Sequence, residues 1–448
     1  MHFQRKLKKR NSNNREKRMR LNIPQAADVK FQTVLMRVDY NVPLEEVDGR
    51  RQVADDQRIE ASFKTLQFLL ENQAKVILIS HLGRPKSTED ADLSLKPIAD
   101  HLKNNLQQPV EFVADLVGKK ARATVAALRP GSAILLENLR FHEGEERNDP
   151  KFAQKLASLA DIYIDEAFSA AHRAHASTVG VAEYLPSFAG FALAEEVEQL
   201  SSLMEAPARP LVIVLGGAKI SDKVGAVKHL AKIADIVLVG GAVANNFLKA
   251  EGLEIFRSYL EDAPADLNKK NIDYVKFAQK LIKTHKNERM LKDGYLPLPK
   301  ILYPIDVMAA KNMEITQKEQ TQIFDLSSGM QDEEENEPLA YYDIGPKTIQ
   351  LYQEIIAQAG TVFWNGPMGV WENPLFAAGT KIIAQAIAKN PHTTIVGGGD
   401  TISAIEHFGL TEKFKYVSAA GGAALDFLSG KMLPGLKVVS KNHHSDLV

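Results

Sequence analysis

The chain has 448 residues, 45% of them hydrophobic and 25% charged, and a formal net charge of −1, a composition typical of a globular protein with two or three domains. It contains no cysteine, which excludes disulfides, thiolate metal sites and a cysteine nucleophile. No apolar run approaches the roughly 18–20 residues of a membrane-spanning helix, so we expect no membrane partner.

Positive charge is concentrated at the N-terminus. Residues 1–20 contain nine Lys or Arg and a single acid, Glu16, giving +8, so the other 428 residues carry −9. A basic tail can bind nucleic acid or acidic membranes, but it can also be a solvated extension, with Met19 nearer the real beginning. We expect residues 1–24 to be a disordered extension without a nucleic-acid partner.

From Val34 onward, apolar runs alternate with amphipathic helical stretches, which predicts a parallel sheet covered by helices. In the first half the predicted strands are Val34–Met36, Val76–Ser80, Ala133–Leu136 and Asp161–Ile164. The residues that follow these strands include Arg37, His81, Arg84, Arg140, His142, His172, Arg173 and His175.

These cations are expected to share one crevice, because ligands bind outside the carboxyl ends of the strands in an open parallel sheet. Arg58, at the start of the helix after the first strand, could join them. Taken singly, such an arginine can be a solvated surface charge and such a histidine a structural group. Their convergence favours a site for a small, multiply charged anion, since the arginine fork suits phosphate and carboxylate.

The segment Phe191–Ala206 has apolar residues at helical spacing and stops at Pro207. It predicts a helix about 24 Å long. Because it lies between two halves that each predict a sheet, we interpret it as their connector, although an ordinary packing helix has the same pattern.

The second half repeats a strand that leads into a glycine turn. The five predicted strands are Leu211–Leu215, Asp235–Val239, Thr361–Trp364, Thr393–Val396 and Tyr416–Ser418. A strand, a glycine turn and a helix N-terminus leave backbone N–H groups unpaired, and these favour an anion, typically phosphate. Neither a P-loop motif nor a G-x-G-x-x-G with a later acid is present, so the pattern predicts a different backbone-lined phosphate cradle.

Charged residues stand beside two of these turns. Lys219 and Lys223 follow Gly216-Gly217 and lie on one helix face if the turn has already become helical. One lysine could neutralise a transferring phosphoryl group and the other hold a nucleotide tail, although two lysines on a helix surface are ordinary. Asp400 could hold a cation beside a phosphate, or it could be the N-cap of the next helix.

Between Glu251 and Leu339 the pattern is weaker. Tyr274–His285 predicts a helix and Lys300–Met308 a strand, and the acidic stretch Gln331–Pro338 predicts an exposed loop. The segment Asp343–Thr348 then predicts a turn and a helix start.

Taken together, these residues resemble phosphoglycerate kinase over most of the chain from Val34 to Leu433. Any one motif is weak, but their number and order are highly specific. The motifs that carry the resemblance are Arg37–Pro43, Ser80–Pro85, Leu136–Phe141, Ala171–His175, Gly216–Lys223, Asp343–Pro346, Trp364–Pro367 and Gly397–Thr401.

The resemblance implies an α/β fold with two Rossmann-like lobes, each a doubly wound parallel sheet, joined by a hinge helix. It implies a cytoplasmic monomer whose lobes close to exclude water from a labile acyl phosphate. The expected parts are the extension at 1–24, a 3-phosphoglycerate-binding lobe at 25–190, the linker helix at 191–206, a nucleotide-binding lobe at 207–430, and a tail at 431–448 that returns to the first lobe.

The implied reaction is reversible phosphoryl transfer between 1,3-bisphosphoglycerate and ADP, giving 3-phosphoglycerate and ATP, with Mg²⁺ accompanying the nucleotide. The implied substrate-binding residues are Asp39, Asn41, Arg58, His81, Leu82, Gly83, Arg84, Arg140 and Arg173. The implied nucleotide-binding residues are Lys219, Lys223, Asn365, Glu372 (a ribose contact), Gly398, Gly399, Asp400 and Thr401. The implied catalytic residues are Arg58, Lys219, Gly421 and Gly422, with Asp400 near the metal.

The residues agree with that chemistry. The acceptor carboxylate is already ionised at pH 7, since a carboxyl group has a pKa of about 4, so no general base is needed. Catalysis then consists of alignment and charge stabilisation.

The chain departs from the family pattern at three places. Ala419-Ala420-Gly421-Gly422 stands where the family usually has Thr-Gly-Gly-Gly, the segment Gly240–Asn246 differs, and the stretch Glu251–Leu339 is longer than usual. An alternative function is therefore a nucleotide-binding family member with reduced or lost turnover. Four retained residues argue against it: Arg58, Lys219, Lys223 and Asp400.

Overall fold

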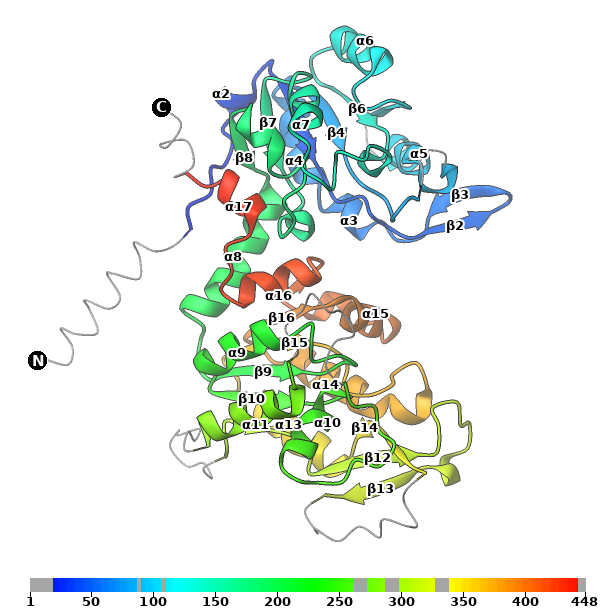
Figure 1. The fold of residues 1–448 in the computed structure, drawn as a ribbon, viewed down its shortest axis with the longest axis vertical. Coiled ribbons are helices and arrows are strands. Elements are labelled where there is room, and N and C mark those ends of the chain that lie inside the picture. The colour runs from blue at the N-terminus through cyan, green and yellow to red at the C-terminus, as the bar shows by residue number, and fades with distance from the viewer. Residues whose placement is uncertain are drawn as a thin grey trace, which may run out of the picture. The chain divides into compact units, whose positions relative to one another are not determined.

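The computed structural model describes residues 19–86, 90–105, 110–261, 272–286, 298–326 and 338–441. The basic head up to residue 18, the acidic residues 331–337 and the C-terminal residues 442–448 lie outside the described residues, and so do the predictions that concern them. The chain divides into two compact units, one of Met1–Ser201 with Met432–Val448 and the other of Ser202–Lys431 (Figure 1).

The first unit is built on a six-stranded parallel sheet with the order β5-β6-β4-β1-β7-β8. Its strands are β1 (Thr33–Arg37), β4 (Lys75–Ile79), β5 (Val110–Val113), β6 (Ser132–Leu136), β7 (Ile162–Asp165) and β8 (Ser187–Ala189). The four strands predicted for this half are confirmed as β1, β4, β6 and β7. These four are neighbours in the sheet, so their carboxyl ends share one edge.

Helices pack around this sheet (Figure 1). In α4 the residues Leu66, Leu69 and Leu70 are buried in the same core cluster as Val76 and Leu78 of β4, so the helical period places an apolar stripe on the sheet. The helices are α2 (Ala26–Val29), α3 (Gln57–Glu60), α4 (Phe63–Glu71), α5 (Lys96–Asn105), α6 (Lys119–Ala127) and α7 (Pro150–Ala157), with 3₁₀ turns η1 (Ala91–Leu93), η2 (Leu139–Phe141), η3 (Phe168–Ala170) and η4 (Gly180–Glu183).

A hairpin that the sequence analysis did not predict lies between β1 and α3. Its antiparallel strands are β2 (Leu44–Val47) and β3 (Arg50–Val53). The two residues between them, Asp48 and Gly49, both have positive φ, 51° and 72°. An Asp-Gly pair favours the two-residue hairpin turn whose twist matches the strands, and this was the signal available in the sequence.

The second unit contains another six-stranded parallel sheet, with the order β11-β10-β9-β15-β16-β17. Its strands are β9 (Leu211–Leu215), β10 (Ile236–Val239), β11 (Ile301–Leu302), β15 (Thr361–Asn365), β16 (Thr393–Gly397) and β17 (Tyr416–Ser418). All five predicted strand–glycine segments are confirmed as members of this sheet. The helix α8 (Phe191–Glu205) precedes it, one residue shorter than the predicted connector helix.

Helices also surround the second sheet (Figure 1). The predicted helix at Tyr274–His285 is confirmed as α11. The helices are α9 (Val224–Ile233), α10 (Val243–Ala250), α11 (Tyr274–His285), α13 (Pro346–Ile356), α14 (Ala378–Lys389), α15 (Gly399–His407) and α16 (Gly422–Leu428), with 3₁₀ turns η5 (Lys318–Gln320), η6 (Pro374–Phe376) and η7 (Thr411–Lys413).

The prediction of one strand over Lys300–Met308 is wrong. Ile301 and Leu302 form β11 of the parallel sheet, whereas β12 (Asp306–Ala310) belongs to an antiparallel sheet with β13 (Gln322–Asp325) and β14 (Ala340–Ile344). Pro304 stands between the two strands and has no N–H to donate to a ladder, so the chain leaves one sheet there and enters the other.

The predicted helix start near Pro346 is confirmed, because α13 begins there. Asp306 of β12 caps it from outside the helix, with its carboxylate accepting from the backbone N–H of Thr348 at 2.7 Å and of Lys347 at 2.9 Å. The small antiparallel sheet is thereby tied to the first turn of α13.

The C-terminal segment belongs to the first unit. There α17 (Pro434–Val438) lies against η3, and the N–H of Gly435 donates to the carbonyl of Ala171 at 2.9 Å. Leu21 and Ser440 form an antiparallel bridge beside it. No helix among the described residues is long and apolar enough to cross a membrane.

Replacement of Gly435 by alanine is expected to destabilise the first unit by about 1–3 kcal/mol, because a Cβ there would lie 2.8 Å from the Cα of Ala171. Chemical denaturation measures the free energy of unfolding. The neighbouring Met432→Ala is the control, since that side chain is 60% exposed and its loss should change the value by no more than about 0.5 kcal/mol. Equal stabilities of the two variants would contradict the close packing of Gly435.

Candidate functional site

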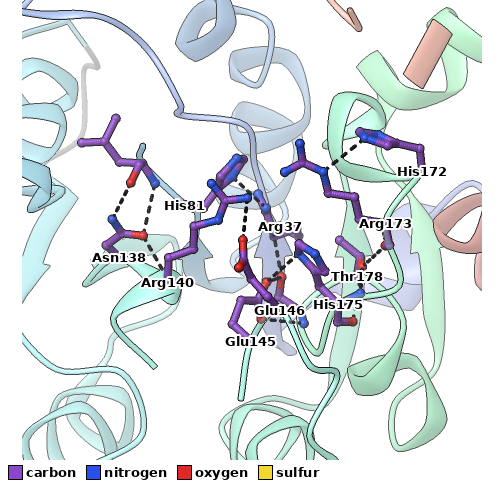
Figure 2. A network of polar contacts seen from close by, with 12 residues as sticks. Arg37, His81, Asn138, Arg140, Glu145, Glu146, His172, Arg173, His175 and Thr178 are labelled. Atoms are coloured by element: carbon purple, nitrogen blue, oxygen red, sulfur yellow. Dashed lines mark hydrogen bonds and ion pairs between the residues drawn. The ribbon is translucent and has the colours of Figure 1, made fainter. Parts of the chain in front are cut away.

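The first candidate site lies where β1, β4, β6 and β7 end. Arg37 closes β1, His81 comes two residues after β4, and η2 with Arg140 comes after β6. Asn138 holds this last turn in place, because its Oδ1 accepts from the N–H of Arg140 at 3.0 Å and its Nδ2 donates to the carbonyl of Leu82 at 2.8 Å (Figure 2). A single buried amide thus fixes the loop after β4 against the loop after β6.

A pocket of about 680 Å³ opens at this edge. Its charge is predominantly positive, since five Lys or Arg and two acids line it. The lining residues are Arg84, Pro85, Lys86, Arg140, Phe141, His142, Glu143, Glu146, Arg147, Arg173 and His175. An anion with several negative charges is the ligand that such a pocket favours.

The side chain of Arg140 is only 7% exposed. Its Nη2 lies 2.9 Å from Oε1 of Glu146, its Nη1 donates to the carbonyl of Gly83, and its buried Nε has no hydrogen-bond partner among the described residues. Burial lowers the pKa of Arg140, Glu146 opposes that shift, and Arg173 adds to it. A ligand anion could relieve the crowding of positive charge.

Four of the other predicted substrate residues form a separate cluster, and His81 instead contacts Arg37. Arg58 lies 3.0 Å from Oδ2 of Asp39 and 3.2 Å from the carbonyl of Asn41, and Oδ1 of Asn41 accepts from the N–H of Gly83 at 2.8 Å. Leu82 is buried beside them. Of the predicted set, then, Arg84, Arg140 and Arg173 line the pocket, whereas Asp39, Asn41, Arg58, His81, Leu82 and Gly83 do not.

Two histidines at this edge are neutral at pH 7. Burial, and next the guanidinium of Arg37, lower the pKa of His81 well below its ordinary 6.5. The same two causes lower the pKa of His175 to about 4. The 3.7 Å approach of His175 Nδ1 to Glu145 is therefore not an ion pair at neutral pH.

Sequence reasoning missed several groups at this edge. Lys86, Glu146 and Arg147 line the pocket, and Glu145 and Ser177 lie behind it without an obvious motif. The dense charge of Glu143–Arg147, directly after the predicted strand–arginine segment, was the available signal for the lining residues. Nothing local marks Ser177.

The second candidate site is the carboxyl edge of the sheet in the second unit. Each of its five turns places a glycine at positive φ, the region that favours glycine. These are Gly217 (91°), Gly241 (58°), Gly366 (96°), Gly398 (97°) and Gly421 (54°). Gly217 and Gly241 donate to the carbonyls of Pro367 and Met368 at 2.7 and 2.8 Å, so neighbouring turns brace one another.

The two predicted lysines do not share a helix face. Because α9 begins at Val224 with Lys223 as its N-cap, Lys219 lies in the turn before it and is exposed. Lys223 donates to Oδ1 of Asn365, whose Nδ2 donates to the carbonyl of Gly397 at 2.9 Å. Burial lowers the pKa of Lys223, and the nearby Asp222 and Asp400 oppose that shift.

The alternative reading of Asp400 as an N-cap is wrong, because Gly398 is the N-cap of α15 and Asp400 is the second helical residue. Its carboxylate is exposed, as is Glu372. Thr401 is fully buried, and its Oγ1 accepts from the N–H of Gly366 at 2.7 Å, so its role here is to hold the turn after β15.

The start of α15 and the turn before α16 leave their backbone open. A Cβ added at Gly399, Gly421 or Gly422 would meet no atom within 4 Å. Ala420, next to Gly421, is buried. Among the described residues, no group of three or more His, Asp or Glu side chains could hold a metal ion.

The family model of phosphoglycerate kinase matches residues 25–431. The phosphoglycerate kinase of Pseudothermotoga lettingae is 44% identical over 413 residues, which cover 92% of this chain and 97% of its own. That of Dictyoglomus turgidum is also 44% identical, with 92% of this chain and 96% of its own covered.

Solved structures agree. The phosphoglycerate kinase of Coxiella burnetii is similar with a TM-score of 0.76 and 37% identity, covering 92% of this chain and 96% of its own. That of Pyrococcus horikoshii OT3 gives a TM-score of 0.73 and 32% identity over the same shares of the two chains.

Replacement of Gly216 by alanine is expected to lower the free energy of unfolding of the second unit by about 2–4 kcal/mol, because the new methyl group would overlap the carbonyl oxygen of Pro367. Differential scanning calorimetry checks it. Gly399→Ala serves as the matched control, since its methyl group would meet nothing within 4 Å and should leave the melting temperature unchanged. A harmless Gly216→Ala would refute the tight contact between the two turns.

His175 is expected to stay neutral down to about pH 5, because its pKa in the folded protein is about 4 rather than 6.5. Its contribution to stability is therefore complete above about pH 6.5 and is lost as the pH falls toward 4. An NMR titration of the imidazole, assigned with His175→Gln, measures the pKa. Half-protonation near pH 6.5 would show that the imidazole is not desolvated.

Proposed function

The chain belongs to the phosphoglycerate kinase family, and from that premise we propose which of its residues carry out the family's reaction. That reaction is the reversible transfer of a phosphoryl group between 1,3-bisphosphoglycerate and ADP, which gives 3-phosphoglycerate and ATP. The enzyme is thus a phosphotransferase with a carboxyl acceptor and a nucleotide substrate.

The first unit is proposed to bind 3-phosphoglycerate. The observation that carries this assignment is the convergence of Arg84, Arg140 and Arg173 on one positive pocket. Arginine forks bind phosphate through paired, charge-assisted hydrogen bonds, so these three are assigned to the phosphate group. We assign the hydroxyl and carboxyl groups of the same substrate to the cluster of Asp39, Asn41 and Arg58. His81, which Arg37 contacts, is assigned to the same groups.

The second unit is proposed to bind ADP or ATP at its glycine edge. Support comes from the five turns at this edge, each of which has a glycine at positive φ that brings the backbone close to the edge. Lys219 and Lys223 lie at the same edge. Backbone N–H groups at Gly398 and Gly399 suit phosphate oxygens, with Asn365 and Thr401 holding the turns from behind. Glu372, which is exposed, is assigned to the ribose.

We propose that Mg²⁺ accompanies the nucleotide at Asp400. The carboxylate is exposed in the first turn of α15, and a single carboxylate fits this ion, which is usually held by one or two carboxylates together with substrate phosphates and water. When bound, Mg²⁺ offsets negative charge on the nucleotide phosphates.

The residues of the chain supply alignment and positive charge. The ionised carboxylate of 3-phosphoglycerate attacks the γ-phosphorus of ATP, a C–O–P bond forms as the bond to the β-phosphate oxygen breaks, and ADP leaves with that electron pair. No proton moves, in keeping with the neutral His81 and His175, which need not act as acid or base. Arg58 and Lys219 are assigned to the oxygens of the phosphoryl group that is transferred. The backbone N–H groups of Gly421 and Gly422 are assigned to the same oxygens.

We propose a monomer, because both sites that the reaction requires belong to one chain. The functional parts are proposed as the extension 1–24, the substrate lobe 25–190, the linker 191–206, the nucleotide lobe 207–430 and the tail 431–448. A cytoplasmic location is proposed because phosphorylated substrates do not cross membranes freely.

Lys219→Ala is expected to lower kcat by about 10²-fold or more, since it removes a positive charge from the transferring group. Turnover of ATP with 3-phosphoglycerate and Mg²⁺, coupled to reduction of the acyl phosphate, measures it. Lys228→Ala is the control, because Lys228 is an exposed lysine on the nearby α9. Its kcat should equal that of the unchanged protein.

Two other outcomes bear on the alternative function. Full turnover by Lys219→Ala would remove this lysine from the catalytic group. No turnover by the unchanged protein, together with tight ADP binding in calorimetry, would favour a binding protein that has lost turnover. Ala419 and Ala420 would then be the first residues to restore to Thr and Gly.

A further inference from the structure

Three buried polar residues lie behind the pocket of the first unit, and the proposed reaction does not use them. Arg37 and Glu145 are each 1% exposed and Ser177 is fully buried. They come from the end of β1, from the loop after η2 and from the loop after η3. Figure 2 shows Arg37 and Glu145 in one network with the pocket residues Arg140 and His175, and Nδ1 of His175 lies 3.7 Å from Oε1 of Glu145.

Ser177 bridges the two opposite charges. Its Oγ lies 2.6 Å from Oε1 of Glu145 and its backbone N–H donates to Oε2 at 3.1 Å. Both oxygens of Glu145 accept from Ser177, so the hydroxyl proton points to Glu145 and a lone pair remains for Nε of Arg37 at 3.0 Å. Burial raises the pKa of Glu145, and the guanidinium of Arg37 and the two hydrogen bonds from Ser177 oppose that shift. The glutamate therefore holds the serine, and the serine holds the guanidinium.

The other end of Arg37 reaches His81. Nη2 of Arg37 lies 3.0 Å from Nδ1 of His81, and Nη1 donates to the carbonyl of Val38. A guanidinium has only donors, so Nδ1 must be the acceptor and carry no proton. A neutral imidazole then has its one proton on Nε2.

We propose that Glu145, Ser177 and Arg37 form a relay that positions His81 and fixes it in its Nε2–H tautomer, which gives the bound 3-phosphoglycerate a hydrogen-bond donor. The substrate contact of His81 rests on the proposed function. The tautomer of His81 does not, because it follows from the contact with Arg37 alone. The opposite tautomer would present a lone pair to a negatively charged oxygen, which is repulsive.

The serine is the sensitive member of this relay. If Ser177 lacked its hydroxyl, no group would stand between the guanidinium of Arg37 and the carboxylate of Glu145. These opposite charges are buried, so they would attract each other strongly in a medium of low dielectric constant. Arg37 would turn toward Glu145 and away from His81. His81 would then lose the donor that keeps Nδ1 unprotonated.

The first test reads the tautomer directly in the ligand-free protein. Long-range ¹H–¹⁵N NMR of the histidine rings, with His81 assigned by the loss of its signal in His81→Gln, should show an unprotonated Nδ1 and a protonated Nε2. Ser177→Ala should move both ¹⁵N shifts toward a mixture of tautomers, and Ser177→Thr, which keeps the hydroxyl, should restore them. A protonated Nδ1 in the unchanged protein, or no shift in Ser177→Ala, overturns the relay.

The second test reads the consequence for the substrate. Ser177→Ala should raise KM for 3-phosphoglycerate by about three- to tenfold, the worth of one hydrogen bond, with kcat and KM for ATP nearly unchanged. In the His81→Ala background the same change should raise KM no further, because the serine acts through the histidine. Additive effects would assign Ser177 a merely structural role and overturn the proposal.

A matched serine provides the control. Ser158 ends α7 on the surface, where its hydroxyl donates to the carbonyl of Lys155 at 2.7 Å, so Ser158→Ala should change neither the ¹⁵N shifts nor KM. The two tests also distinguish a failure of the proposed function from a failure of the relay. A protein without turnover but with the expected tautomer would sink the proposed function and keep the relay in the fold, whereas full turnover with the wrong tautomer would do the reverse.

Discussion

Parallel strand pairing is the constraint on which the rest of this molecule depends. Every strand of each six-stranded sheet runs in the same direction, so every loop that follows a strand emerges at one edge. Residues far apart in the chain therefore meet there without any local sequence signal. Arg37 and Ser177, which bond to each other, are 140 residues apart.

The two edges use this geometry for different chemistry. At the first, long cationic side chains and their buried partners surround an open pocket. At the second, glycines bring the backbone itself to the edge, because a Cβ at Gly216 or Gly366 would collide with the neighbouring turn. Side chains can place charge several ångströms from the sheet, whereas backbone N–H groups act only on a ligand that comes close.

Buried polar side chains hold both edges in shape. Asn138 joins two loops of the first unit, and Asn365 joins the turns after β9, β15 and β16 through Lys223 and Gly397. Asp343 accepts from the N–H of Gly379 at 2.7 Å, and burial raises its pKa to about 8. Burial likewise raises the pKa of Asp165 to about 7, so a carboxyl group can serve here as a neutral structural group.

The sequence by itself determined the two parallel sheets, the strand ends that carry cations or glycines, and the family. These are local signals, since a strand of β-branched residues and a glycine turn are written in consecutive positions. The Asp-Gly turn between β2 and β3 was equally local and was overlooked. The tertiary structure alone decided which residues touch: that Lys219 lies outside α9, that β11 and β12 join different sheets, and that Arg37, Ser177 and Glu145 form one network. Such contacts depend on burial and on hydrogen-bond partners from distant segments, and no spacing in the sequence records those.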